Sequence, residues 1–336
     1  MHVFLIRRLL TLVPVLVIVL VIVFSLVRLI PGDPAVTLLG PGATDAQIAA
    51  LRAQLNLDEP VLLQFWHYVA GLTQGDMGVS LKTGRPVLQE ILSRLPATLE
   101  IAFGAVIVAI VVGTPIGVYS AIRVNRLPDH VLRVLSLTGV SMPAFLLALL
   151  LQLVLGTWLG WLPVSGRISS YYFFDEITGF MLVDAWLSGE PGAVLSALSH
   201  LVLPVIVLSS FLAATLARFI RASMLETLGE DFVRTAKAKG LSRRQVIVGH
   251  ALRNSLLPAI TVVGLKFAEM LGGAILTETV FSWPGLGRFM FDAIQSRDYP
   301  VIQGATLVFA LLFILTSLCV DLLYAALDPR MRRKMT

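Results

Sequence analysis

Six apolar runs divide this sequence, and each is long enough to cross a bilayer as a helix. A crossing takes about 20 residues of helix, because backbone polar groups in hydrocarbon must be paired within the segment. The strict alternation of polar and apolar residues that marks a membrane β-strand is absent. We therefore predict an all-α polytopic membrane protein with six transmembrane helices, at about 9–30, 101–121, 134–155, 201–219, 259–280 and 301–324.

Composition supports one membrane domain over residues 1–336. Charged residues make up 14 % of the chain and hydrophobic residues 57 %, whereas soluble domains carry roughly a quarter charged residues. Arg7 and Arg8 precede the first run as they would in a signal peptide, but the run is longer than a signal core and no small-residue cleavage site follows it. We expect it to be retained as a helix. The single cysteine, Cys319, excludes a disulfide framework.

The distribution of basic residues predicts the orientation. Loops rich in Lys and Arg stay in the cytoplasm, and most of the 26 such residues fall on the side that carries both termini. Both termini are therefore expected to be cytoplasmic. This orientation places an outer segment at 31–100, an outer loop at 156–200 and a cytoplasmic loop at 220–258.

The outer segments are expected to form amphipathic helices at the outer membrane surface. Thr44 and Gln47 have the spacing of a capping box, and a second helix should follow Pro60. A third should open at Arg85-Pro86, with proline at its first position. A cap that packs on the helix bundle is the simpler role, and direct substrate contact is the alternative. In the loop 156–200, aromatic residues form an interfacial belt and the apolar piece 180–187 is too short to span; the belt residues are Trp158, Trp161, Tyr171 and Tyr172.

The cytoplasmic loop has the pattern of two short helices joined by a sharp turn. Acidic Glu230 and Asp231 favour a helix start, and Gly240 has the place of a glycine that ends a helix. Ser242 and Gln245 then have the spacing of a second capping box. A loop that merely joins two spans would not need caps on both helices. We therefore predict a protruding cytoplasmic coupling-helix hairpin that docks another protein.

The same loop resembles the coupling loop of bacterial ABC importer permeases. The general pattern begins Glu-Ala-Ala; Gly240 and Leu252 match it, whereas Arg234-Thr235, His250 and Arg253 depart from it. The strings at 234–241 and 250–254 are similar to the peptide and nickel branch of that family. Further family-like strings lie, in chain order, at 30–34, 113–118, 141–143, 277–287, 297–300 and 327–330. Those at 163–167 and 177–182 are most similar to dipeptide permeases.

The resemblance implies a permease domain that is not an enzyme. Its partners would be a second homologous permease subunit, two ATPase subunits and an extracytoplasmic peptide-binding protein, in the lipid of the bacterial cytoplasmic (inner) membrane. No cofactor is expected on this chain, and ATP and Mg would be used by the ATPases; the chain has no G-x-x-x-x-G-K-[ST] phosphate loop. The net charge of +5 follows the topology and needs no nucleic acid. The ATPase-coupling residues would be Arg234, Thr235, Ala236, Lys237, Ala238, Lys239, Gly240, Leu241 and Ser242, with Ala236, Gly240 and Leu241 as the contact core.

Three groups of residues are candidates for gating or for the pore. Pro115, Met142 and Pro143 would kink or break helices, although an ordinary packing role is as plausible. Lys266 and Glu269 share one face of the fifth span and can pair, toward either a pore or a sister subunit. The turn Trp283-Pro284-Gly285 is expected to help form an outer gate. No role is assigned to Asp321.

Other functions remain open at this stage. One alternative is that the same machinery imports nickel, glutathione, haem or longer peptides instead of dipeptides. A more remote alternative is an ion-coupled secondary transporter, which would use the membrane charges; loss of uptake in Gly240→Asp would argue against it. A membrane enzyme is the weakest candidate, because the histidines are scattered and no two have metal-ligand spacing.

Overall fold

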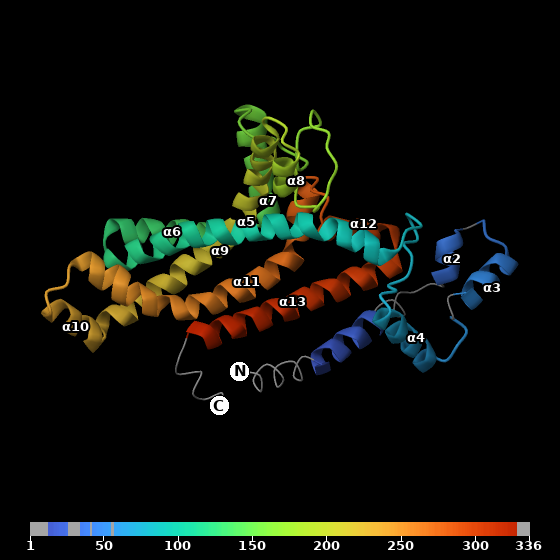
Figure 1. Cartoon of the computed structure of the whole chain (residues 1–336), viewed down its shortest axis with the longest axis horizontal. Coiled ribbons are helices and arrows are strands. Elements are labelled where there is room, and N and C mark those ends of the chain that lie inside the picture. The colour runs from blue at the N-terminus through green and yellow to red at the C-terminus, as the bar shows by residue number, and fades with distance from the viewer. Residues whose placement is uncertain (1–12, 26–33, 41, 55–56, 328–336) are drawn as a thin grey trace. The chain divides into compact units, whose positions relative to one another are not determined.

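The computed structural model describes residues 13–25, 34–40, 42–54 and 57–327, and helices make up most of these ranges (Figure 1). One isolated antiparallel bridge, between Val79 and Pro86, is the sole strand-like pairing among them. The contacts divide the chain into two units. Of the described residues, unit 1 takes in Arg94–Arg288 and 312–327, and unit 2 takes in those between 13 and 93 together with Phe289–Leu311.

Unit 1 contains the long helices. It holds α5 (Val87–Ile122) from Arg94 onward and the end of α13 (Tyr299–Leu327). Two of its elements are π-helical: η1 directly continues α7, and η2 directly precedes α11. The others, in chain order, are α6 (Leu127–Ser141), α7 (Ala144–Leu151), η1 (Gln152–Trp158), α8 (Met181–Leu187), α9 (Ala193–Gly229), α10 (Asp231–Ala238), η2 (Gln245–Leu252) and α11 (Arg253–Val280).

Helix α9 is the centre of unit 1, because α6, α7, α8 and α11 all pack on it. Helix α5 also packs closely on α9, because small residues lie at their contact. A side-chain carbon on Gly113 or Gly117 would collide with the backbone carbonyl of Ala213 or Ala217, respectively. Glycines four apart permit this close approach of two helices. The core beside them is built of Ile101, Ala105, Ala109, Leu208, Leu212, Met270 and Ala274.

Unit 2 contains small helices tied together by side-chain contacts. The helices are an apolar one at Val13–Ser25, α2 (Pro34–Leu39), α3 (Asp45–Gln54), α4 (Val61–Thr73) and most of α12 (Leu286–Ser296). The Phe24 ring lies edge-on to Phe65 of α4, with centroids 5.1 Å apart. Asp298 accepts a 2.6 Å hydrogen bond from the Ser80 hydroxyl and one from the Lys82 amide, which joins the start of α13 to the loop before α5.

Three described helices are long and apolar enough to cross a membrane: Val87–Ile122, Ala193–Gly229 and Tyr299–Leu323. A bent pair, Gln245–Leu256 and Pro258–Gly272, makes up to four if it forms one span. The first and third predicted spans are shorter apolar helices in their described parts, Val13–Ser25 and Ala144–Trp158. The all-helical class is thus confirmed. Three features stay predictions: the number of six transmembrane helices, the side of the membrane on which each terminus lies, and the segment boundaries at 31–100, 156–200 and 220–258.

The helix expected to open at Pro86 begins at Val87 but does not end before the second predicted span. It continues through Glu100 to Ile122 as the single helix α5. Pro96 lies inside it and removes one backbone hydrogen bond, but no glycine or turn residue follows until Gly104. The expectation of a separate third surface helix is therefore wrong.

Candidate functional site

The hairpin of α10 and η2 turns at Gly240 through a Schellman motif. Gly240 has a φ of 76°, in the left-handed region, and its N–H donates to the Lys237 carbonyl at 3.0 Å. The Leu241 N–H donates to the Ala236 carbonyl, which completes the motif. A glycine adopts this φ without the steric cost that a side chain brings. The predicted helix end at Gly240 is confirmed.

The second arm of the hairpin begins with the predicted capping box. The Ser242 N–H donates to Gln245 Oε1 at 2.9 Å, and the Gln245 N–H donates back to Ser242 Oγ at 3.4 Å. These two bonds satisfy amides that the first turn of a helix leaves unpaired. Both arms are thus stabilised locally, before any partner is present.

The hairpin holds together around a small apolar cluster of Val233, Ala236 and Val246. Ala236 is buried there, so it supports the hairpin from within, and its place in the contact core stays a prediction. The reason for its burial is its spacing: it lies one turn after Val233, on the face toward η2. Leu241 is half-buried, and the exposed candidates are Arg234, Thr235, Lys237, Ala238, Lys239, Gly240 and Ser242.

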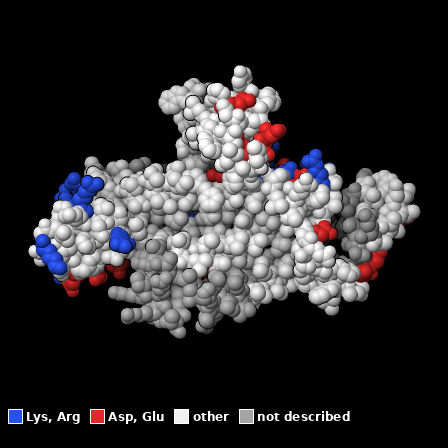
Figure 2. All heavy atoms as spheres, viewed as in Figure 1, with Lys and Arg blue, Asp and Glu red and all other residues white. Residues whose placement is uncertain are grey.

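Basic residues dominate the outside of this hairpin, and Figure 2 shows Lys and Arg gathered at the end of unit 1 that carries α10. Beneath them lies a pocket of about 380 Å³. Lys237 and Arg243 supply its charged rim, and apolar residues from α5, α9 and η2 supply its floor; these are Ala121, Ile122, Leu228, Val246 and Ile247. The hairpin therefore contacts the ends of two long helices.

A buried ion pair next to this hairpin was missed by the sequence analysis. Asp129, at the start of α6, accepts hydrogen bonds from Nε and Nη2 of Arg221 on α9, both at 2.8 Å. It also accepts from the Ser120 hydroxyl of α5 and from the Asn125 amide at 2.9 Å. One carboxylate thus joins α5, α6 and α9. The sequence signal at Asp129 was the string Leu127-Pro128-Asp129, which is typical of a helix start. That pattern predicts a helix cap, but it does not indicate an ion-pair partner 92 residues away.

The pKa of Asp129 lies below its ordinary value. The Arg221 hydrogen bonds are the main cause, while burial acts in the opposite direction and the Ser120 and Asn125 bonds add to the lowering. The same interaction raises the pKa of Arg221. Asp129 is therefore charged at neutral pH, and the pair is a permanent electrostatic link.

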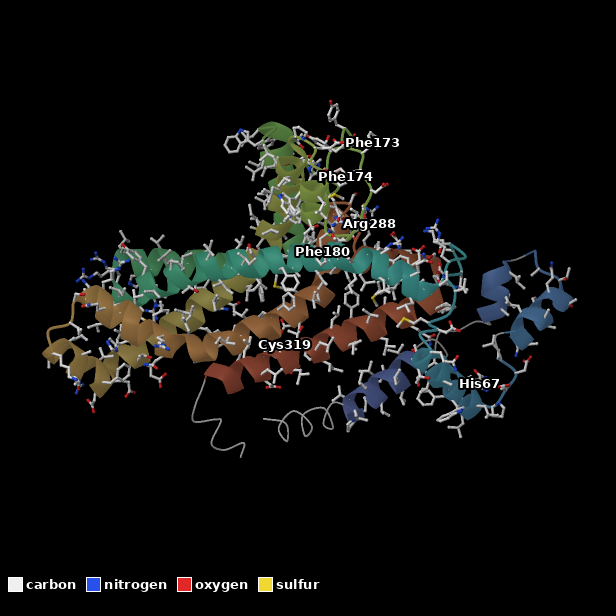
Figure 3. All side chains as sticks on the ribbon, in the orientation of Figure 1. His67, Phe173, Phe174, Phe180, Arg288 and Cys319 are labelled. Atoms are coloured by element: carbon white, nitrogen blue, oxygen red, sulfur yellow. The ribbon has the colours of Figure 1, made fainter. Side chains whose placement is uncertain are left out.

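The predicted outer gate, Trp283-Pro284-Gly285, belongs to a buried network at the end of α11. The Trp283 indole N–H donates to the Ala97 carbonyl of α5 at 2.8 Å. Glu278 accepts from the Thr98 hydroxyl at 2.6 Å and from the Arg288 amide at 2.8 Å. Trp283 is buried, so this turn is fixed to α5; Figure 3 labels Arg288, which lies beside α5.

The turn requires glycine at positions 285 and 287, because there is no space for a side chain there. A side-chain carbon on Gly285 would collide with the Glu278 carboxylate, which lies against it. Gly287 is limited in the same way by the backbone of Ile275. The gate role of the turn remains a prediction, but its rigidity follows from these contacts.

A second buried pair, Arg167 with Glu100, fixes the loop 156–200 in unit 1. Arg167 donates to Glu100 Oε2 at 2.8 Å and to the Gly179 carbonyl at 2.7 Å. Asp184 of α8 accepts from the Thr178 hydroxyl and the Gly179 amide, which folds the segment before α8 into a cap. Figure 3 labels three aromatic residues of this loop, Phe173, Phe174 and Phe180; Phe180 lies nearest α5 and Phe173 farthest from it.

The helix-break candidates differ in outcome. α6 ends at Ser141 and α7 begins at Ala144, with Pro143 as its N-cap and Met142 in the break. Pro115 lies inside α5, which continues without interruption, so this proline does not end the helix. Its neighbours Gly113 and Gly117 pack against α9 and hold the helix there.

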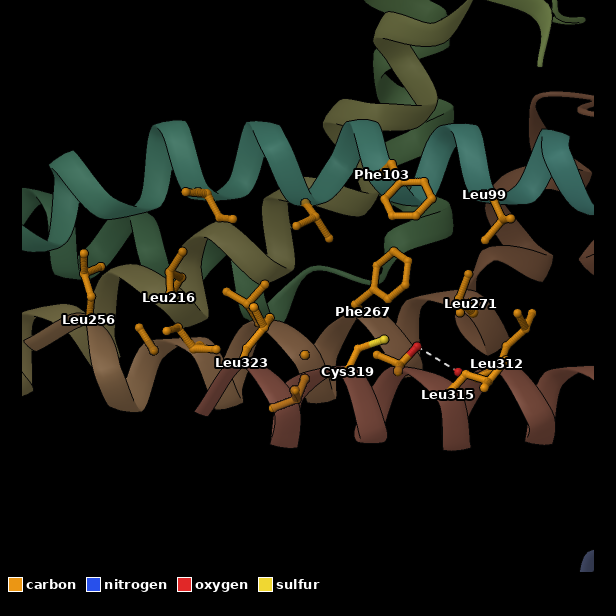
Figure 4. Close-up of a pocket in the computed structure, with 18 of the residues that line it drawn as sticks. Leu99, Phe103, Leu216, Leu256, Phe267, Leu271, Leu312, Leu315, Cys319 and Leu323 are labelled. Carbon is orange, nitrogen blue, oxygen red and sulfur yellow. Dashed lines mark hydrogen bonds between the residues drawn. The ribbon is translucent and has the colours of Figure 1, made fainter. Parts of the chain in front are cut away.

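An apolar cavity of about 650 Å³ lies in unit 1 among α5, α9, α11 and α13 (Figure 4). Phe103 and Phe267 both line it and contact each other, with ring centroids 5.2 Å apart. No charged residue lines it; Lys266 and Glu269 lie outside its wall on α11. No cluster of metal-ligating side chains occurs among the residues that the structure describes.

These features define the class of protein: a helical membrane subunit with a capped, basic hairpin that contacts its long helices. The chain belongs to the family of binding-protein-dependent transport system inner membrane components, whose model matches residues 113–333. The N-terminal model of the same transport systems matches residues 1–102. The protein is therefore an inner membrane transport component.

Curated relatives match over nearly the whole length. The dipeptide transport system permease protein of Escherichia coli (strain K12) is 46 % identical over 335 residues, which cover 98 % of this chain and 99 % of that protein. The di/tripeptide transport system permease protein of Pseudomonas aeruginosa (strain UCBPP-PA14) is 46 % identical over 332 residues, with the same coverage. The glutathione transport system permease protein of Salmonella choleraesuis (strain SC-B67) is 44 % identical over 331 residues, again covering 98 % and 99 %.

A solved structure supports the fold. A chain of the methionine ABC transporter MetNI, in inward-facing conformations, superposes with a TM-score of 0.52 at 16 % identity. The match covers 71 % of this chain and 96 % of that one. At this identity the likeness concerns the fold alone.

Proposed function

We propose that this chain is a permease subunit of an ATP-driven importer that carries short peptides, chiefly dipeptides, across the bacterial inner membrane. The observation that carries the proposal is the 46 % identity, over almost the full length, to relatives named as dipeptide permeases. The chain supplies half of the translocation pathway. A second homologous permease supplies the other half, and a peptide-binding protein outside the membrane delivers the cargo.

Two ATPase subunits drive the cycle and use ATP and Mg; this chain binds neither. Their contact is the exposed turn of the hairpin, centred on Gly240 and the basic residues beside it. The support is the pre-capped, rigid form of the hairpin and its packing on α5 and α9. A push on such a hairpin moves long helices as bodies, which is how nucleotide-driven switches reach a distant gate.

The proposed topology has six spans and both termini in the cytoplasm. It places the hairpin on the inner side and α8 with the outer loop on the other. Three to four spans are evident by length and composition. The excess of Lys and Arg on the hairpin side supports the orientation.

The test is uptake of a radiolabelled dipeptide in a strain that lacks this chain and every other peptide importer. We expect uptake to be lost and to return when the chain is supplied with its partner subunits. Excess unlabelled dipeptide should compete with the label, and excess glutathione should not. Failure to restore uptake would overturn the dipeptide assignment.

Glutathione is the second candidate cargo, because one relative at 44 % identity is named for it. It is itself a tripeptide, so the same pathway could accept it. If excess unlabelled glutathione lowered the uptake of labelled dipeptide through this chain, that result would favour glutathione as a cargo. A control with labelled nickel tests the metal alternative in the same strain.

A further inference from the structure

Two opposite charges share one face of α11 within the fifth predicted span. Lys266 Nζ donates to Glu269 Oε2 at 2.5 Å, one helical turn away. The Lys266 ammonium also lies 5.2 Å from the ring centroid of Phe211 on α9. The Lys266 side chain is 25 % exposed and that of Glu269 is 57 % exposed. A carboxylate exposed to this extent in a span does not face hydrocarbon at acceptable cost, so it faces water or another polypeptide.

The other two acidic groups within the predicted spans already have partners. Glu278 is buried and bonded to Thr98 and to the Arg288 amide. Asp321 takes part in an interaction as well. The apolar cavity of unit 1 has no charged lining. Within the described parts of the spans, Lys266 and Glu269 therefore form the one exposed pair of complementary charges.

The chemistry of the proposed cargo complements this pair. Every dipeptide carries an ammonium at one end and a carboxylate at the other at neutral pH, whatever its side chains. These end groups are costly to move from water unless each finds an opposite charge. A pathway that accepts varied side chains can recognise only what all dipeptides share, which is the backbone and its two charged ends.

We propose that Lys266 and Glu269 form a transit site for the zwitterionic ends of peptide cargo, a role that rests on the proposed function. Without cargo, the two side chains neutralise each other, with Lys266 held over Phe211. With cargo, Lys266 binds the peptide carboxylate and Glu269 binds the peptide ammonium. The exchange leaves the net charge of the site at zero, so neither state contains an unpaired charge in the membrane.

The experiment uses the complete importer reconstituted in liposomes with its binding protein. Four chains are compared: wild type, Glu269→Gln, the double neutral variant Lys266→Met with Glu269→Gln, and the control Glu190→Gln, which removes an exposed acid from the outer loop. Dipeptide import and copurification with the partner subunits are measured for each. Wild-type import is established first, and its failure would remove the proposed function before any variant is tested.

The double neutral variant distinguishes binding of the peptide ends from simple pairing of Lys266 with Glu269. It leaves no unpaired charge, so a pair that only neutralises itself would lose nothing. We expect copurification to persist and import to fall about tenfold, since charge-assisted hydrogen bonds to the peptide ends are lost. Import at the wild-type rate would overturn the proposal. So would loss of copurification, which would assign the pair to a subunit interface.

A labelling experiment gives an independent readout. Glu269→Cys is made together with Cys319→Ser, which removes the native thiol. We expect a charged, water-soluble thiol reagent to modify this cysteine in the assembled importer, and dipeptide under turnover conditions to slow the reaction. An unreactive cysteine, or one that dipeptide does not protect, would contradict a site in the peptide path.

Discussion

At the residue scale, single side chains with fixed partners control the hairpin and the helices beneath it. Gly240 sets the sharp turn because only its left-handed φ of 76° allows η2 to fold back on α10. Asp129 joins three helices through Arg221, Ser120 and the Asn125 amide. A change at Gly240 alters the backbone geometry of the hairpin, and a change at Asp129 alters the charge balance beside it.

We expect Gly240→Val to weaken the hairpin by about 1–2 kcal/mol, because a branched side chain is strained at positive φ. Nothing lies within 4 Å of the new side chain's first carbon, so strain and not collision is the cause. Dipeptide uptake should fall while the chain remains in the membrane. The control is Gly249→Ala in η2, where the site is equally open and φ is not positive. Equal uptake by both variants would contradict a special need for glycine at 240.

We expect Asp129→Asn to destabilise unit 1 by about 3 kcal/mol, because Arg221 is left with an unpaired, largely buried charge. Thermal unfolding of the purified chain in detergent measures the loss. The control Asp231→Asn removes an acid that is almost fully exposed and should change the unfolding temperature little.

The same ion pair predicts a pH dependence. The folded pKa of Asp129 is lowered, so its stabilisation is complete above its ordinary value of about 4 and is lost as the pH falls through the folded value. Between neutral pH and about pH 5, the difference in unfolding temperature between wild type and Asp129→Asn should therefore stay constant. A difference that shrank already near pH 6 would contradict the assigned pKa direction.

At the element scale, the contact of α5 with α9 depends on the absence of side chains. Gly113 and Gly117 let the backbone of α5 approach the carbonyls of Ala213 and Ala217. The hairpin packs against the ends of the same two helices. Any movement that the hairpin receives thus reaches a helix pair that is closely packed along its length.

We expect Gly117→Ala to separate these helices and to destabilise unit 1 by about 1–3 kcal/mol, since the added carbon meets the Ala217 carbonyl and Ile220. A lower unfolding temperature in detergent is the measurement. Gly272→Ala on α11 is the matched control, because nothing lies within 4 Å of its added carbon and alanine favours helix. A larger loss at 272 than at 117 would refute the close-packing argument.

At the scale of the whole molecule, the proposed orientation is testable by labelling. In a Cys319→Ser background, Lys82→Cys should react with a membrane-impermeant thiol reagent in intact cells. Lys239→Cys, in the hairpin turn, should react only after the membrane is opened. Both side chains are exposed, so reactivity reports the compartment. The reverse pattern would invert the topology and place the hairpin outside, away from any ATPase.

Local sequence determined much of this protein. The apolar runs specify helices because lipid leaves the backbone no other way to pair its polar groups, and Gly240, Ser242 and Gln245 specify the hairpin through bonds that span only a few residues. The sequence also indicated the family, through motifs that each occupy a short stretch of chain.

Only the tertiary structure decided which distant groups meet. Asp129 and Arg221 lie 92 positions apart, and Thr98 and Glu278 lie 180 apart; no local pattern encodes such pairs, because they follow from helix packing. The same holds for Ala236, whose burial depends on Val246 across the turn. It holds also for α5, where packing of Gly113 and Gly117 on α9 keeps one helix continuous through a proline that a local reading expects to break it.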